Sequence, residues 1–256
     1  MEIDINCDMG EGYGPYRMGD DQTLLGLVSS ANIACGFHAG DPLTMVNTVQ
    51  EAVRQDVDIG AHPGFKDRLH FGRRKLPYDL KELRAEVLYQ LGALQAMAAA
   101  CGRSVTHMSF HGAMGNLMYV EKELAESLVS AVASVDKDII LPVLPNIETE
   151  RAAHRFGLRT VYKFFADREY GTNGLIVPRS VPNSVIHDHQ RAAQRVLQLL
   201  DSGTVTTIDG QRISMKAQVV MVHGDGPGAV ELASAVRQLV EQGGGRIVPL
   251  SRLAAN

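Results

Sequence analysis

Apolar, β-branched runs in this chain repeatedly end in short clusters of glycine, histidine and acidic residues. The clusters read DINCDMGEG, ANIACGFHAGD, IGAHPG, FHGAMGN, FADREY and VHGDGPG, and amphipathic stretches of helical period separate most of them. Alternating strands and helices are typical of a parallel sheet. Because the carboxyl ends of such strands meet on one face, the pattern predicts one polar site at the mouth of an α/β barrel.

The same periodicity places the elements between the clusters. Asp41 followed by Pro42, and Asp79 followed by Glu82, are helix starts, because each aspartate can accept hydrogen bonds from N–H groups of the first turn. About seven core strands are expected, which favours a distorted seven-stranded (β/α) barrel over a regular eightfold one. Besides the strands that open the first two clusters, we expect strands near 57–62, 105–111, 139–144, 160–165, 219–222 and 246–248, helices near 42–53, 80–101, 121–134, 192–200 and 229–242, and a small hairpin near 209–210.

Length and composition narrow the class of protein. A chain of 256 residues that is 45% hydrophobic can bury one large core, so we expect a single domain over 1–256. A net charge of −4 gives no basic stripe for nucleic acid, and no apolar run reaches the roughly 20 residues that span a bilayer. With no signal-peptide pattern, the expected location is cytoplasmic. No heptad fixes an oligomeric state, so a homo-oligomer stays open.

The cysteines point to a reducing compartment. Cys7, Cys35 and Cys101 are odd in number and lack CxxC spacing, so a disulfide framework is not expected. Cys7 and Cys35 lie on predicted strands outside any nucleophile motif. We interpret both as buried, inert thiols.

The first strand carries acidic and amide side chains on one face. A period of two places Asp4, Asn6 and Asp8 together, opposite Ile3 and Ile5. Such a stripe inside a barrel either fixes the barrel through hydrogen bonds or reaches the site. We assign Asp8, nearest the carboxyl end, to the site, and both interpretations stay open for Asp4.

Four histidines follow apolar strands and are bordered by glycine: His38, His62, His111 and His223. One such histidine is usually structural, but four at equivalent strand ends indicate function. Imidazoles there can act as general acids and bases, or can ligate a metal beside Asp8. Residue spacing does not choose between the two, because the residues come from different strands.

Other charged residues at strand ends suit an anionic small molecule. Asp167 and Arg168 are either a simple ion pair or part of the site, where Arg168 and Arg73 can together clamp a carboxylate. Asp225 either orients His223, acts as a base or caps the following helix. The chain has no GxxxxGK[ST] phosphate loop, so use of a nucleotide requires another arrangement or a partner.

Taken together, the motifs resemble the LamB/YcsF lactam-utilisation family, whose described members are the A subunits of bacterial 5-oxoprolinases. The matching segments run from about residue 3 to residue 250 and read DINCDMGEGYG, ANIACGFHAGDP, IGAHPGF with FGRR, HGAMGN, FADREY with Gly174 and Arg179, and VHGDGP. The resemblance implies a seven-stranded barrel of the glycoside hydrolase/deacetylase type. It also implies ATP-dependent hydrolysis of the cyclic amide of 5-oxoproline to L-glutamate, together with the B and C subunits.

The resemblance and the strand-end chemistry give one set of expected site residues. ATP is the expected co-substrate, with Mg²⁺ as its companion ion, and a bound metal would be held by Asp8, His62 and His111. The expected catalytic residues are Asp8, His62, His111, Asp167 and His223, and the expected substrate-binding residues are Asn6, Glu11, Asn32, His38, Asp41, Arg73, Lys163, Arg168 and Asp225.

Three positions depart from the family pattern. Ser109 and Phe110 stand where Lys-Pro is usual, Lys163 stands where glutamate is usual, and Gly115 replaces a tyrosine. If Ser109 and Lys163 face each other across the barrel mouth, the cation is supplied from the opposite strand. The departures keep two alternatives open: a member acting on another lactam, and a small-molecule binding or regulatory subunit without turnover. The pattern of an aspartate with several histidines, which the related barrels share, keeps open a third, a stand-alone metal-dependent deacetylase or amide hydrolase.

Overall fold

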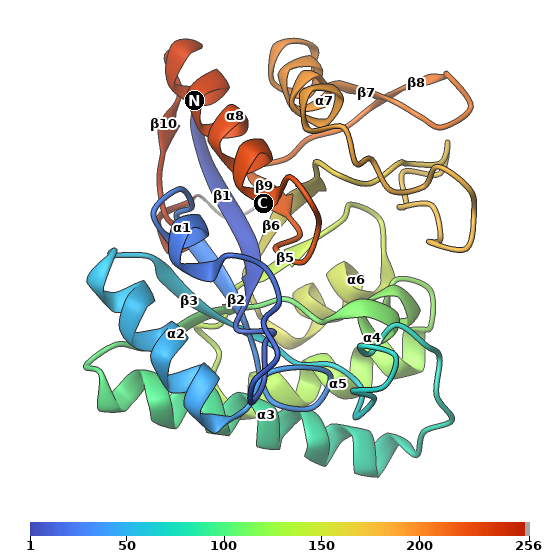
Figure 1. The fold of residues 1–256 in the computed structure, drawn as a ribbon. Helices are drawn as coiled ribbons and strands as arrows, with labels where there is room; N and C mark the ends of the chain where they lie inside the picture. The colour runs from blue at the N-terminus through green and yellow to red at the C-terminus, as the bar shows by residue number, and fades with distance from the viewer. Residues whose placement is uncertain (254–256) are drawn as a thin grey trace.

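The strands form a nearly closed parallel barrel, in a computed structural model that describes residues 1–253 (Figure 1). Their order is β4-β3-β2-β1-β9-β6-β5. The two ends meet where His107 bridges Ile140 in parallel, with the N–H of Met108 donating to the Ile140 carbonyl at 3.0 Å. The predicted seven-stranded barrel is confirmed. Its strands are β1 (Glu2–Met9), β2 (Ser30–Ala34), β3 (Asp58–His62), β4 (Val105–Met108), β5 (Leu141–Val143), β6 (Thr160–Phe165) and β9 (Val219–Val222).

Helices pack around the outside of these strands. In Figure 1, α2, α3 and α5 lie along one side of the barrel, whereas α7 lies at the opposite side near α8. No helix within residues 1–253 is long and apolar enough to cross a membrane. The helices are α1 (Asp21–Leu25), α2 (Pro42–Arg54), α3 (Leu80–Ala100), α4 (Gly112–Met118), α5 (Lys122–Val135), α6 (Glu148–Phe156), α7 (His189–Ser202) and α8 (Ala229–Gln242).

The predicted helix starts are confirmed. Asp41 accepts a hydrogen bond from the Thr44 N–H at 2.8 Å, and Asp79 caps α3 in the same way. The hairpin is formed by β7 (Thr204–Thr206) and β8 (Arg212–Ser214), and β10 (Arg246–Ile247) pairs with β1. The chain closes with a short 3₁₀ turn, η1 (Leu250–Arg252).

A polar layer crosses the barrel interior. Asn6 and Asn32 are fully buried, and their amides approach His107 Nε2 at 3.2 and 3.1 Å. Asn32 also donates to Asp8 Oδ1 at 2.8 Å. Buried polar groups that are hydrogen-bonded in this way fix their partners, so this layer holds Asp8 in place from below.

The polar layer requires glycine at position 60. A Cβ at Gly60 would lie 2.1 Å from His107 Nε2. We therefore expect Gly60→Ala to lower the free energy of unfolding by about 1–3 kcal/mol, as overpacking does. Urea denaturation measures this, with Gly92→Ala in α3 as the control, since a Cβ there meets no atom within 4 Å. Equal stability of Gly60→Ala and the unchanged protein would contradict the packing argument.

Asp4 belongs to the structural part of the first strand. Its Oδ1 accepts hydrogen bonds from the hydroxyls of Ser29 and Ser30 at 2.7 and 2.6 Å, while Oδ2 is buried and has no partner within residues 1–253. Burial raises the pKa of Asp4 to about 7, against the lowering effect of the two serines. Of the two interpretations, hydrogen bonding that fixes the barrel describes Asp4.

This raised pKa predicts a pH-dependent stability. The folded state holds the Asp4 proton up to about pH 7, whereas the unfolded chain releases it near pH 4, so the free energy of unfolding falls between these values. The loss is on the order of 4 kcal/mol. Asp4→Asn is expected to flatten this slope in urea titrations from pH 4 to 8, while Asp209→Asn in the exposed hairpin turn keeps it. An unchanged slope in Asp4→Asn would refute the assignment.

Candidate active site

A cavity of about 270 Å³ opens at the carboxyl ends of the barrel strands. The segments that follow β1, β3, β4, β6 and β9 contribute to it, as expected for a barrel site. The structure thus brings together side chains from sequence clusters far apart in the chain. Among the lining residues are Asp8, His62, Arg73, Ser109, His111, Asn116, Tyr119, Arg168, Arg179, Ser180 and His223.

His62 and His111 approach each other through one ring nitrogen of each residue. His62 Nδ1 donates to the Ser109 carbonyl at 2.5 Å, and His111 Nε2 donates to the Phe71 carbonyl at 2.8 Å, because carbonyl oxygens only accept. The remaining nitrogens, His62 Nε2 and His111 Nδ1, lie 2.9 Å apart. With both outer protons fixed, these two lone pairs require a proton or a cation between them. The pair is therefore built to hold one exchangeable proton.

Two carboxyl groups beside this pair differ in charge. Asp8 Oδ1 lies 3.4 Å from His62 Nε2. Burial alone would raise the pKa of Asp8, but the interaction with His62 outweighs it and holds that pKa well below its usual range. Burial raises the pKa of Glu11 well above its usual range, and the charges of Asp8 and Asp225 add to the rise. Two carboxyl groups with pKa values pushed apart can serve as base and acid.

His38 is clamped against His111. The two rings stack with centroids 3.8 Å apart and planes 4° from parallel, and His38 Nε2 lies 3.3 Å from Glu11 Oε1. Gly64 and Gly72 allow this, since a Cβ at either position would come within 2.8 Å of the His38 side chain. Burial lowers the pKa of His38, and the neighbouring His111 lowers it further. His38 is thus a neutral ring in a rigid setting.

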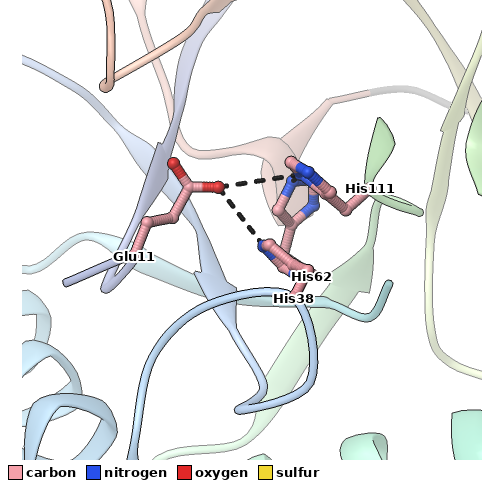
Figure 2. A group of neighbouring side chains, drawn as sticks. All are labelled: Glu11, His38, His62 and His111. Carbon is pink, nitrogen blue, oxygen red and sulfur yellow. Dashed lines mark hydrogen bonds and ion pairs between the residues drawn. The ribbon is translucent and has the colours of Figure 1, made fainter. Parts of the chain in front are cut away.

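The same residues offer ligands for a metal ion. Ligand atoms of Glu11, His38, His62 and His111 lie within 4.8 Å of one another (Figure 2). An imidazole binds a metal in its ring plane, so the stacked His38 and His111 rings do not aim at one ion. Glu11, His62 and His111 remain as a nitrogen-and-oxygen set of the kind found in catalytic zinc sites. The residues fit a divalent transition metal. Glu11 is the carboxylate near His38 and His111, whereas Asp8, the carboxylate expected from the sequence, lies near His62, and its assignment as a ligand stays a prediction.

His223 is oriented by Asp167. Both carboxylate oxygens of Asp167 lie within hydrogen-bond distance of His223 Nδ1, at 2.7 and 2.9 Å. Burial alone would raise the pKa of Asp167, but His223 lowers it. Asp167 therefore pairs with this histidine, and does not form an ion pair with its sequence neighbour Arg168. His223 Nε2 is left for the cavity.

Arg73 and Asp225 form an ion pair of 2.7 Å. The carboxylate of Asp225 therefore does not orient His223, and the residue at the start of α8 is Gly228, which has no side-chain cap. Arg73 lines the cavity, but its positive charge is already paired with the carboxylate of Asp225. Of the three sequence interpretations, neither the orienting nor the capping role of Asp225 is observed.

Arg168 is the buried guanidinium of the site. It is 3% exposed, donates to the carbonyls of Ser184 and Val177, and forms no ion pair with a carboxylate within residues 1–253. Burial lowers its pKa to about 10, and Arg179 lowers it further. An arginine held by carbonyl groups at a cavity wall can bind a substrate carboxylate.

The side chains of Ser109 and Lys163 meet, as the sequence departures suggested, and they come from the two strands that flank β5: Ser109 directly follows β4, and Lys163 lies in β6. Lys163 Nζ lies 3.3 Å from Ser109 Oγ. Burial lowers the pKa of Lys163 to about 8, against the opposing effect of Asp8.

The remaining sequence-predicted residues are not among those that line the cavity. Asn6 and Asn32 lie in the polar layer beneath Asp8, and Asp41 caps α2 while accepting from the Gly14 N–H at 2.6 Å. Their assignment to substrate binding stays a prediction. Tyr119 and Asn116 line the cavity and were not singled out from the sequence. The HGAMGN motif just before Tyr119 was the available signal.

Sequence comparisons find close relatives of this chain. The LamB/YcsF family model matches residues 3–255. An A subunit of 5-oxoprolinase from Bradyrhizobium diazoefficiens is 49% identical over 99% of each chain, and one from Pseudomonas syringae pv. tomato is 51% identical over 99% of each.

Solved structures support the same conclusion. The crystal structure of a lactam utilization protein from Thermus thermophilus matches with a TM-score of 0.92 and 40% identity, covering 98% of this chain and 100% of that one. The catalytic domain of a peptidoglycan N-acetylglucosamine deacetylase from Eubacterium rectale, at 12% identity and a TM-score of 0.52, shares the fold, and covers 100% of this chain and 91% of its own. The family match and the close relatives show that this chain belongs to the LamB/YcsF family.

Proposed function

We propose that this protein is the A subunit of a 5-oxoprolinase and opens the ring of 5-oxoproline to give L-glutamate. Relatives at about half identity over nearly the whole chain carry this name. The observation that carries the proposal is the 2.9 Å contact between His62 Nε2 and His111 Nδ1, next to Asp8 and on the wall of a cavity that also holds Arg168. These are the groups that hydrolysis of a small anionic amide requires.

Each group has a role in the proposed reaction. Arg168 binds the substrate carboxylate and thereby fixes the ring in the cavity. The His62 and His111 pair gives its shared proton to the ring nitrogen and takes one back from the attacking water, while Asp8 stabilises the protonated pair. Asp167 holds His223 in one orientation on the cavity wall, where its Nε2 can donate to the carbonyl oxygen.

ATP supplies the driving force in this proposal. A five-membered lactam is a stable amide, and phosphorylation of its oxygen creates a leaving group before water attacks. The chain carries no phosphate loop of the GxxxxGK[ST] type, which favours an ATP site formed with the B and C subunits. Mg²⁺ accompanies the ATP, and the complex works in the cytoplasm.

The proposal is tested by glutamate release from 5-oxoproline. The assay combines this chain with or without its B and C subunits, and with or without ATP. We expect product only when ATP and the complete complex are present. Absence of product from a complex whose partners are active with a relative of this chain would contradict the proposed substrate, and would favour another lactam.

A second candidate function is metal-dependent hydrolysis of an amide. The convergence of Glu11, His62 and His111 on one point favours it. These side chains would hold the ion, which when bound polarises a carbonyl and lowers the pKa of water. Elemental analysis of the purified protein, followed by amide hydrolysis assays without ATP, separates the candidates. A stoichiometric metal with ATP-independent, chelator-sensitive turnover would favour this second function.

A further inference from the structure

Lys163 is a buried lysine that no carboxylate within residues 1–253 contacts directly, and Asp8 acts on its charge from beyond ion-pair distance. It lies in β6, its side chain is 4% exposed, and it takes part in none of the ion pairs formed within residues 1–253. The surroundings of its side chain are largely apolar: Phe165, whose ring centroid lies 5.1 Å from Nζ, and Met108, Met118 and Leu141. Buried lysines are rare unless paired, because the charged form loses its hydration. Burial lowers the pKa of Lys163 to about 8, so the neutral amine, which is a base, is reached at mildly alkaline pH.

Ser109 lies between this amine and the cavity. Its hydroxyl is 3.3 Å from Lys163 Nζ, and the residue lines the same cavity as His62, His111 and Arg168. Lys163 lines a separate, smaller pocket. Its amine meets the lining of the larger cavity at the Ser109 hydroxyl. A nucleophile in front of a base within hydrogen-bond reach is the arrangement of serine nucleophiles activated by lysine.

The backbone around Ser109 is fixed. Its N–H donates to the Ala61 carbonyl at 3.0 Å, and its carbonyl accepts from His62 Nδ1. The hydroxyl is thus presented from a strand end whose main chain is bonded on both sides. A rigidly held nucleophile beside the His62 and His111 pair places acylation and water activation in one cavity.

We propose that Ser109 is a nucleophile and Lys163 its general base, so that ring opening passes through an ester on Ser109. The inference rests on the proposed lactam substrate. Lys163, in its neutral form, takes the hydroxyl proton as Ser109 Oγ bonds to the ring carbon, and phosphate leaves that carbon with the former carbonyl oxygen. Water then adds to the same carbon, and the His62 and His111 pair passes its proton to the ring nitrogen as the carbon–nitrogen bond breaks, which leaves an ester on Ser109. A second water hydrolyses the ester to the carboxylate, and Lys163 returns the proton to Ser109 Oγ.

The first test uses a fluorophosphonate probe, which modifies activated serines, on the full chain alone. We expect labelling at Ser109, located by peptide mass mapping, and loss of labelling in Ser109→Ala. Ser180 is an internal control, since it lines the same cavity but has no lysine partner within residues 1–253. Labelling of Ser180 at the same rate as Ser109, or no labelling of Ser109, would overturn the proposal.

Two variants of Lys163 distinguish a role as a base from a role as a positive charge alone. Lys163→Arg keeps the charge but cannot release its proton, whereas Lys163→Met removes both. We expect both variants to be labelled about 10²-fold or more slowly than the unchanged protein, as loss of a general base predicts. Thermal unfolding checks that each variant is folded. Full labelling of folded Lys163→Arg would show that Lys163 acts as a cation only, and would overturn its role as base.

The second test looks for the ester with 5-oxoproline in the complete complex. Rapid acid quenching should trap an increment of one substrate mass on the peptide that contains Ser109, and hydroxylamine should remove it. Ser109→Ala that releases glutamate at the normal rate would refute the ester while leaving the proposed function intact. No glutamate from any complex, with Ser109 still labelled by the probe, would instead refute the proposed substrate and leave the serine and lysine pair standing.

Discussion

His62→Ala and His111→Ala are expected to lower the rate of ring opening by about 10²–10⁴-fold, the range for loss of a general acid or base. Each change removes one of the two nitrogens that share the proton, at 2.9 Å, so the other histidine is left without its partner. Because the two act as a unit, the double variant should be little worse than either single one. The measurement is kcat for glutamate release by the complete complex.

A surface histidine provides the control for these variants. His154 in α6 is exposed, and His154→Ala should keep the normal rate. Circular dichroism and the thermal midpoint establish that the cavity variants are folded. Near-normal turnover in folded His111→Ala would remove the shared proton from the mechanism.

Arg168→Met is expected to raise KM for 5-oxoproline by about 10–150-fold, which corresponds to loss of roughly 1.5–3 kcal/mol from charged hydrogen bonds. The KM of Arg168→Lys should lie between those of the unchanged protein and Arg168→Met, because lysine keeps the charge but cannot form two parallel hydrogen bonds to a carboxylate. Arg73→Met should have a smaller effect, since that guanidinium is already paired with Asp225. Steady-state kinetics of the complex measure all three variants.

A truncated substrate separates carboxylate binding from structural damage. Arg168 also donates to the Val177 and Ser184 carbonyls, so its loss can disturb the loop that carries them. 2-Pyrrolidinone has the same ring without the carboxylate. If Arg168 binds the carboxylate, kcat/KM for this compound should be alike in the unchanged protein and in Arg168→Met. An equal loss with both substrates would show that the loop, and not the carboxylate contact, was affected.

The elements with regular patterns were predictable from the sequence. Asp41 and Asp79 began their helices as expected, and α8 matches its predicted span of 229–242. By contrast, α1, α4 and α6 were not predicted. α4 contains Gly112 and Gly115, which are poor helix formers, and α1 has only 5 residues, so neither shows a clear period. α4 buries Ala113, Met114 and Met118 and packs against α5, which its sequence pattern does not show.

The sequence indicated which strand ends form the site, but not which side chains pair with each other within it. Sequence reasoning placed His62, His111 and His223 at one mouth because parallel strands share a direction. It did not find that Asp167 holds His223, or that Arg73 pairs with Asp225, since loop conformations decide those contacts. The carbonyls of Ser109 and Phe71, which fix the protons of His62 and His111, leave no sequence signal because every residue has a carbonyl.

Glutamate release from 5-oxoproline by the complete complex, with ATP, tests the central claim most directly when the unchanged chain is compared with folded His62→Ala. The account predicts ATP-dependent glutamate from the unchanged complex and a rate lower by about 10²-fold or more from the variant. Equal rates from the two complexes, or no glutamate from an unchanged complex with active partners, would contradict it.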